Sequence, residues 1–117
     1  MTREELVAYC LAKPGAYRDS PWGEDHDVAK VGGKIFCFFS KQAAPPGVTV
    51  KATAERTAEW RDRFPEHVGP APYLPKHLWN AVALHGLGAP DGEDARELID
   101  DSYDLVVATL PRSKRPS

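Results

Sequence analysis

The chain has 117 residues, of which 42% are hydrophobic, enough for the core of one domain. Its 15 basic and 17 acidic residues give a formal net charge of -2, so the basic excess typical of nucleic-acid-binding domains is absent and any such surface must be local. No stretch approaches the roughly 18 apolar residues that span a bilayer, and no signal-peptide pattern begins the chain, so we expect a cytoplasmic protein.

A capping box begins the first predicted element. Thr2 and Glu5 have the spacing at which each side chain bonds the other residue's backbone, and apolar residues at helical spacing follow. The pattern predicts a helix at about residues 3–13, ended by Pro14 and Gly15. The polar stretch at 17–25 is expected to be a connection.

The strongest local pattern is a β-hairpin at residues 27–40. Gly32 and Gly33 can both adopt the positive φ of a primed two-residue turn between apolar-rich strands. The aromatic run at 35–39 indicates a sheet that is covered on both faces, or one face that is partly open to a ligand. The pairs predicted by a two-residue turn are Val31 with Lys34, Lys30 with Ile35, Ala29 with Phe36, Val28 with Cys37 and Asp27 with Phe38.

Further along the chain, an alternating pattern predicts a third strand at 48–51, followed by a helix at 54–64 that Thr53 caps. Prolines favour two short extended segments, around 72–74 and 79–84, as a second hairpin. Asp91 begins a last helix that Pro111 ends. We therefore expect one α+β domain at 1–111, an antiparallel sheet of hairpins with N-terminal, middle and C-terminal helices, and a short, mobile basic tail at 112–117.

The sequence contains no recognisable catalytic or metal-binding motif, so we expect no enzyme activity, metal or cofactor. His26 beside Asp27 could form a general-base pair, but a hydrogen-bonding role at the entry to the first strand is favoured. Cys10 and Cys37 lie within apolar patterns and are expected to be reduced core residues. The acidic residues of the last helix are interpreted as a solvated face.

The charged residues between positions 28 and 54 are all lysines: Lys30, Lys34, Lys41 and Lys51. Lysines on hairpins can contact phosphates. They also keep exposed strands from pairing with other chains, and the sequence leaves both interpretations open.

Three segments resemble the MmcQ/YjbR family: residues 26–36, residues 71–74 with 76–80, and residues 98–106. The resemblance implies a small α+β fold with a double-wing arrangement of hairpins, for which DNA binding is commonly inferred, and it supplies no catalytic residues. It predicts weak or non-specific contact with DNA through the cations on and near the wings. These are Lys30, Lys34, Lys51, Lys76, His77, Arg112, Lys114 and Arg115.

A second hypothesis is that the protein sequesters or carries a small aromatic compound, because members of this family occur in antibiotic-producing settings, where such a protein would confer antibiotic resistance. The aromatic residues expected to line the pocket are Trp22, Phe36, Phe38, Tyr73 and Trp79. A third hypothesis, protein interaction through the acidic last helix, is favoured only by the charge asymmetry.

Overall fold

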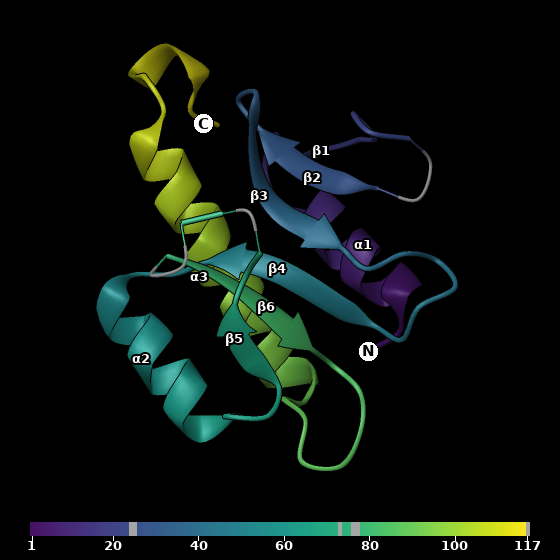
Figure 1. The fold of residues 1–117 in the computed structure, drawn as a ribbon. Helices are drawn as coiled ribbons and strands as arrows, with labels where there is room; N and C mark the ends of the chain where they lie inside the picture. Colours follow the sequence, from purple (N-terminus) through teal and green to yellow (C-terminus); the bar gives the residue numbers. More distant parts are fainter. Residues whose placement is uncertain (24–25, 73, 76–77, 117) are drawn as a thin grey trace.

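Antiparallel strands build the centre of the molecule. Within residues 1–23, 26–72, 74–75 and 78–116, which the computed structural model describes, six strands form one sheet in the order β1-β2-β3-β4-β6-β5 (Figure 1). The predicted α+β fold with an antiparallel sheet of hairpins is confirmed. The strands are β1 (Tyr17–Asp19), β2 (Val28–Val31), β3 (Lys34–Phe39), β4 (Gly47–Lys51), β5 (Val68–Pro70) and β6 (Trp79–Ala83).

The turn of the β2–β3 hairpin is the predicted one, with φ of 58° at Gly32 and 86° at Gly33. The pairs next to the turn, Val31 with Lys34 and Lys30 with Ile35, are confirmed. Beyond them the register shifts by one residue, so the other three predicted pairs are wrong. Ala29 pairs with Cys37 and Val28 with Phe38, which leaves Phe36 as the extra residue of a β-bulge.

The bulge allows two consecutive residues of β3 to enter the core. Phe36 and Cys37 are both completely buried in the same cluster, whereas regular alternation along a strand would place them on opposite faces of the sheet. Ser102 satisfies the backbone groups that the irregular pairing affects. Its hydroxyl donates to the carbonyl oxygen of Phe36 at 2.6 Å and accepts from the backbone N–H of Lys51 at 2.8 Å.

Three α-helices begin at side-chain caps, as the sequence predicts. Thr2 and Asp91 each form a capping box, and the Thr53 hydroxyl accepts from the backbone N–H of Arg56 at 3.1 Å. The helices are α1 (Arg3–Leu11), α2 (Ala54–Arg63) and α3 (Gly92–Thr109). Over the described residues, none of them is long and apolar enough to cross a membrane.

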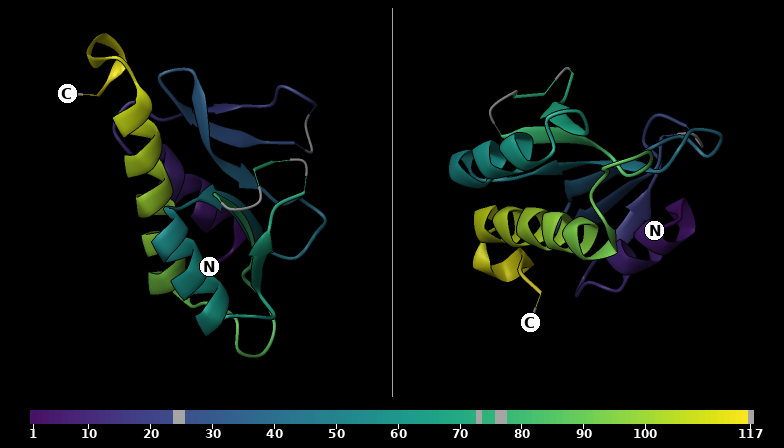
Figure 2. Two further views of the ribbon diagram at one scale, coloured as in Figure 1. Left: turned by 60° about the vertical axis from the view of Figure 1, so that its left-hand side comes forward. Right: turned by 90° about the horizontal axis from the view of Figure 1, so that it is seen from below.

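Two helices cover one face of the sheet, and the third lies at its edge. Figure 2 shows α1 and α3 packed against the same face, with α2 beside α3 at the edge formed by β5. Arg56 ties α2 to α3 through ion pairs with Glu97 at 2.6 Å and Asp101 at 3.2 Å. The opposite face of the sheet has no helix over it in the described part of the chain (Figure 2).

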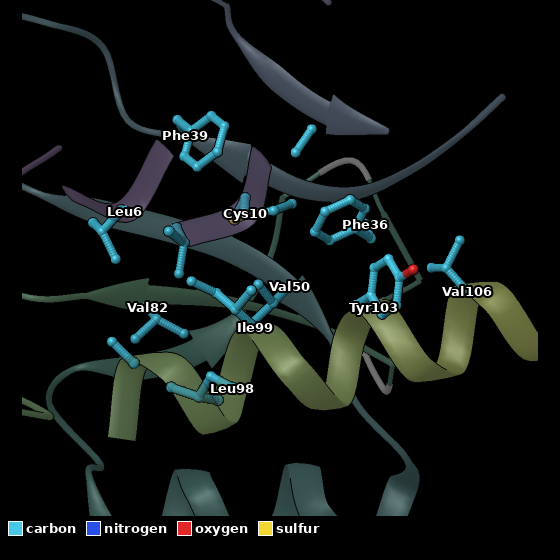
Figure 3. Close-up of a cluster of buried hydrophobic side chains, with 14 of the residues drawn as sticks. Leu6, Cys10, Phe36, Phe39, Val50, Val82, Leu98, Ile99, Tyr103 and Val106 are labelled. Atoms are coloured by element: carbon cyan, nitrogen blue, oxygen red, sulfur yellow. The ribbon is translucent and has the colours of Figure 1, made fainter. Parts of the chain in front are cut away.

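The core fills the layer between the sheet and these helices (Figure 3). Phe36 is completely buried there and meets the ring of Tyr103 on α3 edge-on, with centroids 5.2 Å apart. Leu6 and Cys10 of α1 and Ile99 of α3 pack into the same cluster. Both cysteines are free, as expected, and burial raises the pKa of the Cys37 thiol.

Three segments differ from the sequence predictions. Strand β1 forms within the stretch expected to be a connection, and β5 precedes the extended segment expected at 72–74. Both are three-residue edge strands, too short for a pattern of alternating side chains. The tail was expected to be mobile, but Arg112–Lys114 form a 3₁₀ turn and the Arg115 guanidinium donates to the carbonyls of Leu110 and Ala108.

Candidate functional site

The sheet face turned away from the helices is the candidate site. Alternation along β4 and β6 directs Val48, Val50, Asn80 and Val82 towards the helices, where all four are buried. The residues between them point to the other side. We call this side the open face; its residues on strands β3 to β6 are Phe38, Gly47, Thr49, Lys51, Gly69, Trp79, Ala81 and Ala83.

Three aromatic side chains lie together at one end of the open face. The ring of Phe38 stacks on Trp22, with centroids 6.3 Å apart and planes 14° apart, and meets Trp79 edge-on at 5.5 Å. Trp22 is 62% exposed, while Phe38 and Trp79 are half-buried. We call these three residues the aromatic ladder. An exposed tryptophan in such a ladder offers a flat apolar surface to a planar partner.

A groove of about 480 Å³ lies on the open face next to the ladder, although none of the three ladder residues lines it. Thr49 and Ala81, which pair across β4 and β6, lie in its floor, and Thr49 also pairs with Phe38. Small side chains make the floor low. At Gly47 a side chain would not fit, because a Cβ would lie 2.9 Å from the carbonyl oxygen of Val82.

Prolines form much of the groove's walls, with a few polar groups among them. Pro45, Pro46, Pro65 and Pro70 line it, together with Glu66, His67 and His85. Ser40 also lines the groove, and its Oγ is buried without a hydrogen-bond partner in the described structure. A buried hydroxyl without a partner is unusual in a folded protein.

Asp27 anchors the segment that carries Trp22. Its carboxylate, almost completely buried, accepts from the guanidinium groups of Arg3 at 2.9 Å and of Arg18, and from the Ser20 hydroxyl at 2.6 Å. The hydrogen bond from Arg18 is the largest cause that holds the pKa of Asp27 well below its usual range, ahead of those from Ser20 and Arg3. Asp27 thus has the hydrogen-bonding role expected at the entry to the first strand of the hairpin.

The aromatic residues predicted to line a pocket do not all meet. Trp22, Phe38 and Trp79 do meet, in the ladder. Phe36 was wrongly grouped with them, because the bulge turns it into the core against Tyr103. Tyr73 lies outside the described residues.

The cations predicted to contact DNA are divided between separate surfaces. Lys30 is paired with Asp19 at 2.7 Å, and Lys51 lies on the open face, where its strand position pairs with that of Trp79. Lys34 lies near the end of α3, with its Nζ 3.2 Å from the hydroxyl of Thr109.

The exposed tail residues Arg112 and Lys114 lie near the same end of α3 as Lys34. A Cβ on Gly32 would lie 3.2 Å from the carbonyl oxygen of Lys114. The Arg115 guanidinium is engaged with backbone carbonyls. Lys76 and His77 lie outside the described residues.

Ser40, His67, His85 and the small floor residues were not singled out as site residues from the sequence. The one usable signal was the alternation of small and larger residues in 47–50 and 80–83, which predicts little side-chain volume on one face of these two segments. Over the described residues, His, Cys, Asp and Glu form no cluster of three or more that could hold a metal ion.

Comparison with known proteins gives consistent matches over most of the chain. The model of the YjbR family matches residues 11–105. The Escherichia coli K12 protein YjbR is 33% identical over 115 residues, covering 98% of this chain and 95% of that protein. The Escherichia coli O157:H7 protein YbdF is 30% identical over 97 residues, covering 79% and 73% of the two chains.

Solved structures share the fold. The Deinococcus radiodurans protein DR2400, described as a DUF419 domain, superimposes with a TM-score of 0.85 at 25% identity, covering 97% of this chain and 84% of that chain. A Pseudomonas syringae protein superimposes with a TM-score of 0.68 at 21% identity, covering 90% and 98%. The second likeness supports the fold alone.

Proposed function

The chain belongs to the YjbR family, and from this premise, together with its open sheet face, we propose that it binds a small planar aromatic molecule without converting it. The binding site is the aromatic ladder with the adjoining groove. A carrier or sequestering protein of this kind requires a preformed apolar surface and a few polar groups that orient the ligand.

The observation that carries this proposal is the 62% exposure of Trp22 in a ladder on a face that no helix covers in the described residues. Leaving a large aromatic side chain in water forgoes the favourable free energy of burying it. A planar ligand stacked on the ladder would recover part of that free energy, and a well-placed aromatic pair contributes about 0.5–1.5 kcal/mol beyond the area that it buries. The groove's volume, about 480 Å³, is that of a small-molecule site.

The experiment is a titration with 2-naphthol, followed by NMR chemical shifts of the backbone amides. We expect shifts on the open face and saturable binding, weakened several-fold by Trp22→Ala. The matched control is Tyr17→Ala, which removes another exposed aromatic side chain, on β1 and outside the ladder. Equal affinity of the two variants, or no saturable binding to the unaltered protein, would reject the proposal.

DNA binding is the second candidate, and one observation favours it. Lys34, Arg112 and Lys114 lie close to one another at the end of α3. Such a cluster could contact phosphates, and its affinity for a short DNA duplex would then fall steeply with salt and be lost in the double variant Lys34→Glu, Lys114→Glu. Fluorescence anisotropy of a labelled duplex at several salt concentrations measures this, and absent or salt-insensitive binding rejects it.

A further inference from the structure

Lys51 lies beside the aromatic ladder and forms no ion pair with any described residue. It pairs with Trp79 across β4 and β6, and residues directly opposite each other in an antiparallel pair have Cβ atoms about 4.5–5.5 Å apart. Trp79 meets Phe38 edge-on, so the lysine stands at one end of the ladder and Trp22 at the other. The Lys51 side chain is half-buried, and its ammonium group on a flexible stem can reach a molecule stacked on the ladder.

The charges on this side of the sheet favour an anion over a cation. Lys51 is the only charged residue among those named above for the open face of β3 to β6. On the neighbouring strands, Asp19 and Lys30 pair at 2.7 Å and so neutralise each other. The acidic residue Glu66 lines the groove, but its chain neighbour hydrogen-bonds Ala83, four positions or about 13 Å along β6 from the residue that faces Lys51.

An aromatic carboxylate would use the ladder and the lysine together. Its rings would stack on the ladder and recover part of the free energy that the exposed Trp22 forgoes. Its carboxylate would accept a hydrogen bond from the Lys51 ammonium, and such charge-assisted bonds are about twice as strong as bonds between neutral groups. Because the ladder is an open surface, the carboxylate would keep part of its hydration, and the large cost of burying a charge would not arise.

We propose that the ligand is a planar aromatic carboxylate, held by stacking on the ladder and by an ion pair with Lys51. This inference rests on the proposed function and adds the ligand's charge and chemical class. It makes Lys51 a specificity-determining residue, since the ladder alone would bind an uncharged ligand of the same shape equally well. Neither Lys51 nor any ladder residue lines the groove, so this contact belongs to the ladder end of the open face.

The test compares 2-naphthoate with 2-naphthamide, an uncharged ligand of nearly the same shape, as NMR titrants of the full chain at neutral pH. We expect 2-naphthoate to bind roughly two- to tenfold more tightly, the range for one partly exposed charge-assisted hydrogen bond. Added salt should reduce this preference, because it screens exposed charges. Lys51→Gln should abolish the preference and leave the affinity for 2-naphthamide unchanged, whereas Lys51→Arg, which keeps the charge, should preserve it.

The matched control is Lys34→Gln, which removes the same charge from β3. The Lys34 ammonium lies 3.2 Å from the hydroxyl of Thr109 on α3, a helix that packs against the opposite face of the sheet. The preference for 2-naphthoate should therefore survive this change, which separates the local effect of Lys51 from the effect of net charge.

The outcomes separate the two proposals. The inference about the ligand is overturned, while binding on the open face stands, if 2-naphthamide binds as tightly as 2-naphthoate, if salt leaves the preference unchanged, if Lys51→Gln keeps it, or if Lys34→Gln removes it equally. If neither compound binds and 2-naphthol does not bind either, the proposed function fails and the inference fails with it. Thermal unfolding of Lys51→Gln checks its fold, and we expect a Tm close to that of the wild type because the ammonium has no partner among the described residues.

Discussion

Replacing Gly32 with alanine should destabilise the protein more than the same change at Gly33, although the two residues share one turn. Both have positive φ, 58° and 86°, where a residue with a Cβ loses about 1–2 kcal/mol. At Gly33 nothing lies within 4 Å of an added Cβ, so Gly33→Ala should lose only that amount.

At Gly32 the added Cβ would lie 2.6 and 2.9 Å from the two Cδ atoms of Leu110. Leu110 is only 2% exposed, so its side chain has little room to move away. Overpacking of this kind costs about 1–3 kcal/mol, which brings the expected loss for Gly32→Ala to about 2–5 kcal/mol. The Cβ would also crowd the backbone of Lys114, at 3.2 Å.

The free energy of unfolding is measured by urea titration, with tryptophan fluorescence and circular dichroism as independent probes. A double-mutant cycle isolates the contact. Leu110→Ala combined with Gly32→Ala should cost clearly less than the sum of the single changes, whereas its combination with Gly33→Ala should be additive. Equal losses at the two glycines, or additivity in both pairs, would show that the turn does not press against the end of α3.

Three further outcomes are expected. Asp27→Asn should destabilise the protein by about 3–5 kcal/mol, because two guanidinium groups then lose their buried counter-charge. The pKa of Asp27 is lower in the folded than in the unfolded protein, so its carboxylate stabilises the fold fully at a pH above the unfolded pKa of about 3.9. This stabilisation is lost as the pH falls towards the folded pKa. Urea titrations from pH 7 to pH 2 should therefore show a smaller acid-induced loss of stability in the variant than in the wild type. Ser102→Ala should cost about 1–3 kcal/mol for each of the two backbone groups left without a partner, measured by the same titration, whereas a loss under 1 kcal/mol would mean that water replaces the hydroxyl. Cys37 should be inert to a thiol reagent in the native protein and react only after unfolding, because burial both raises its pKa and blocks access; rapid native modification would contradict this.

Local sequence patterns were sufficient for the elements whose ends are chemically marked. The Gly32-Gly33 turn and the caps at Thr2, Thr53 and Asp91 each depend on a few neighbouring residues, and all are present. The bulge depends instead on what α3 presents to β3 from a distant part of the chain. Ser102 and Phe36 are 66 positions apart, so no local pattern could predict their contact.

The candidate site could be predicted only in part, for the same reason. The ladder could be found because its three residues, Trp22, Phe38 and Trp79, are large aromatic residues, which are candidates for ligand contact in any sequence. The groove depends on β4 pairing with β6, two strands separated in the chain by a helix and another strand. Only that pairing places Thr49 beside Ala81. Ser40 lines the same groove, which no local sequence pattern predicts.

The bulge at Phe36 also determines which side chains of β3 face the core and which face the open side. In an unbroken strand, Phe36 and Phe38 would share one side, and one surface of the protein would hold both rings. The extra residue shifts the alternation by one step, so one ring completes the interior and the other meets solvent beside Trp22. Deleting Phe36 would therefore restore a regular strand and leave Cys37, Phe38 and Phe39 on their present sides, whereas pairing all of β3 without the bulge would exchange inside for outside beyond Phe36.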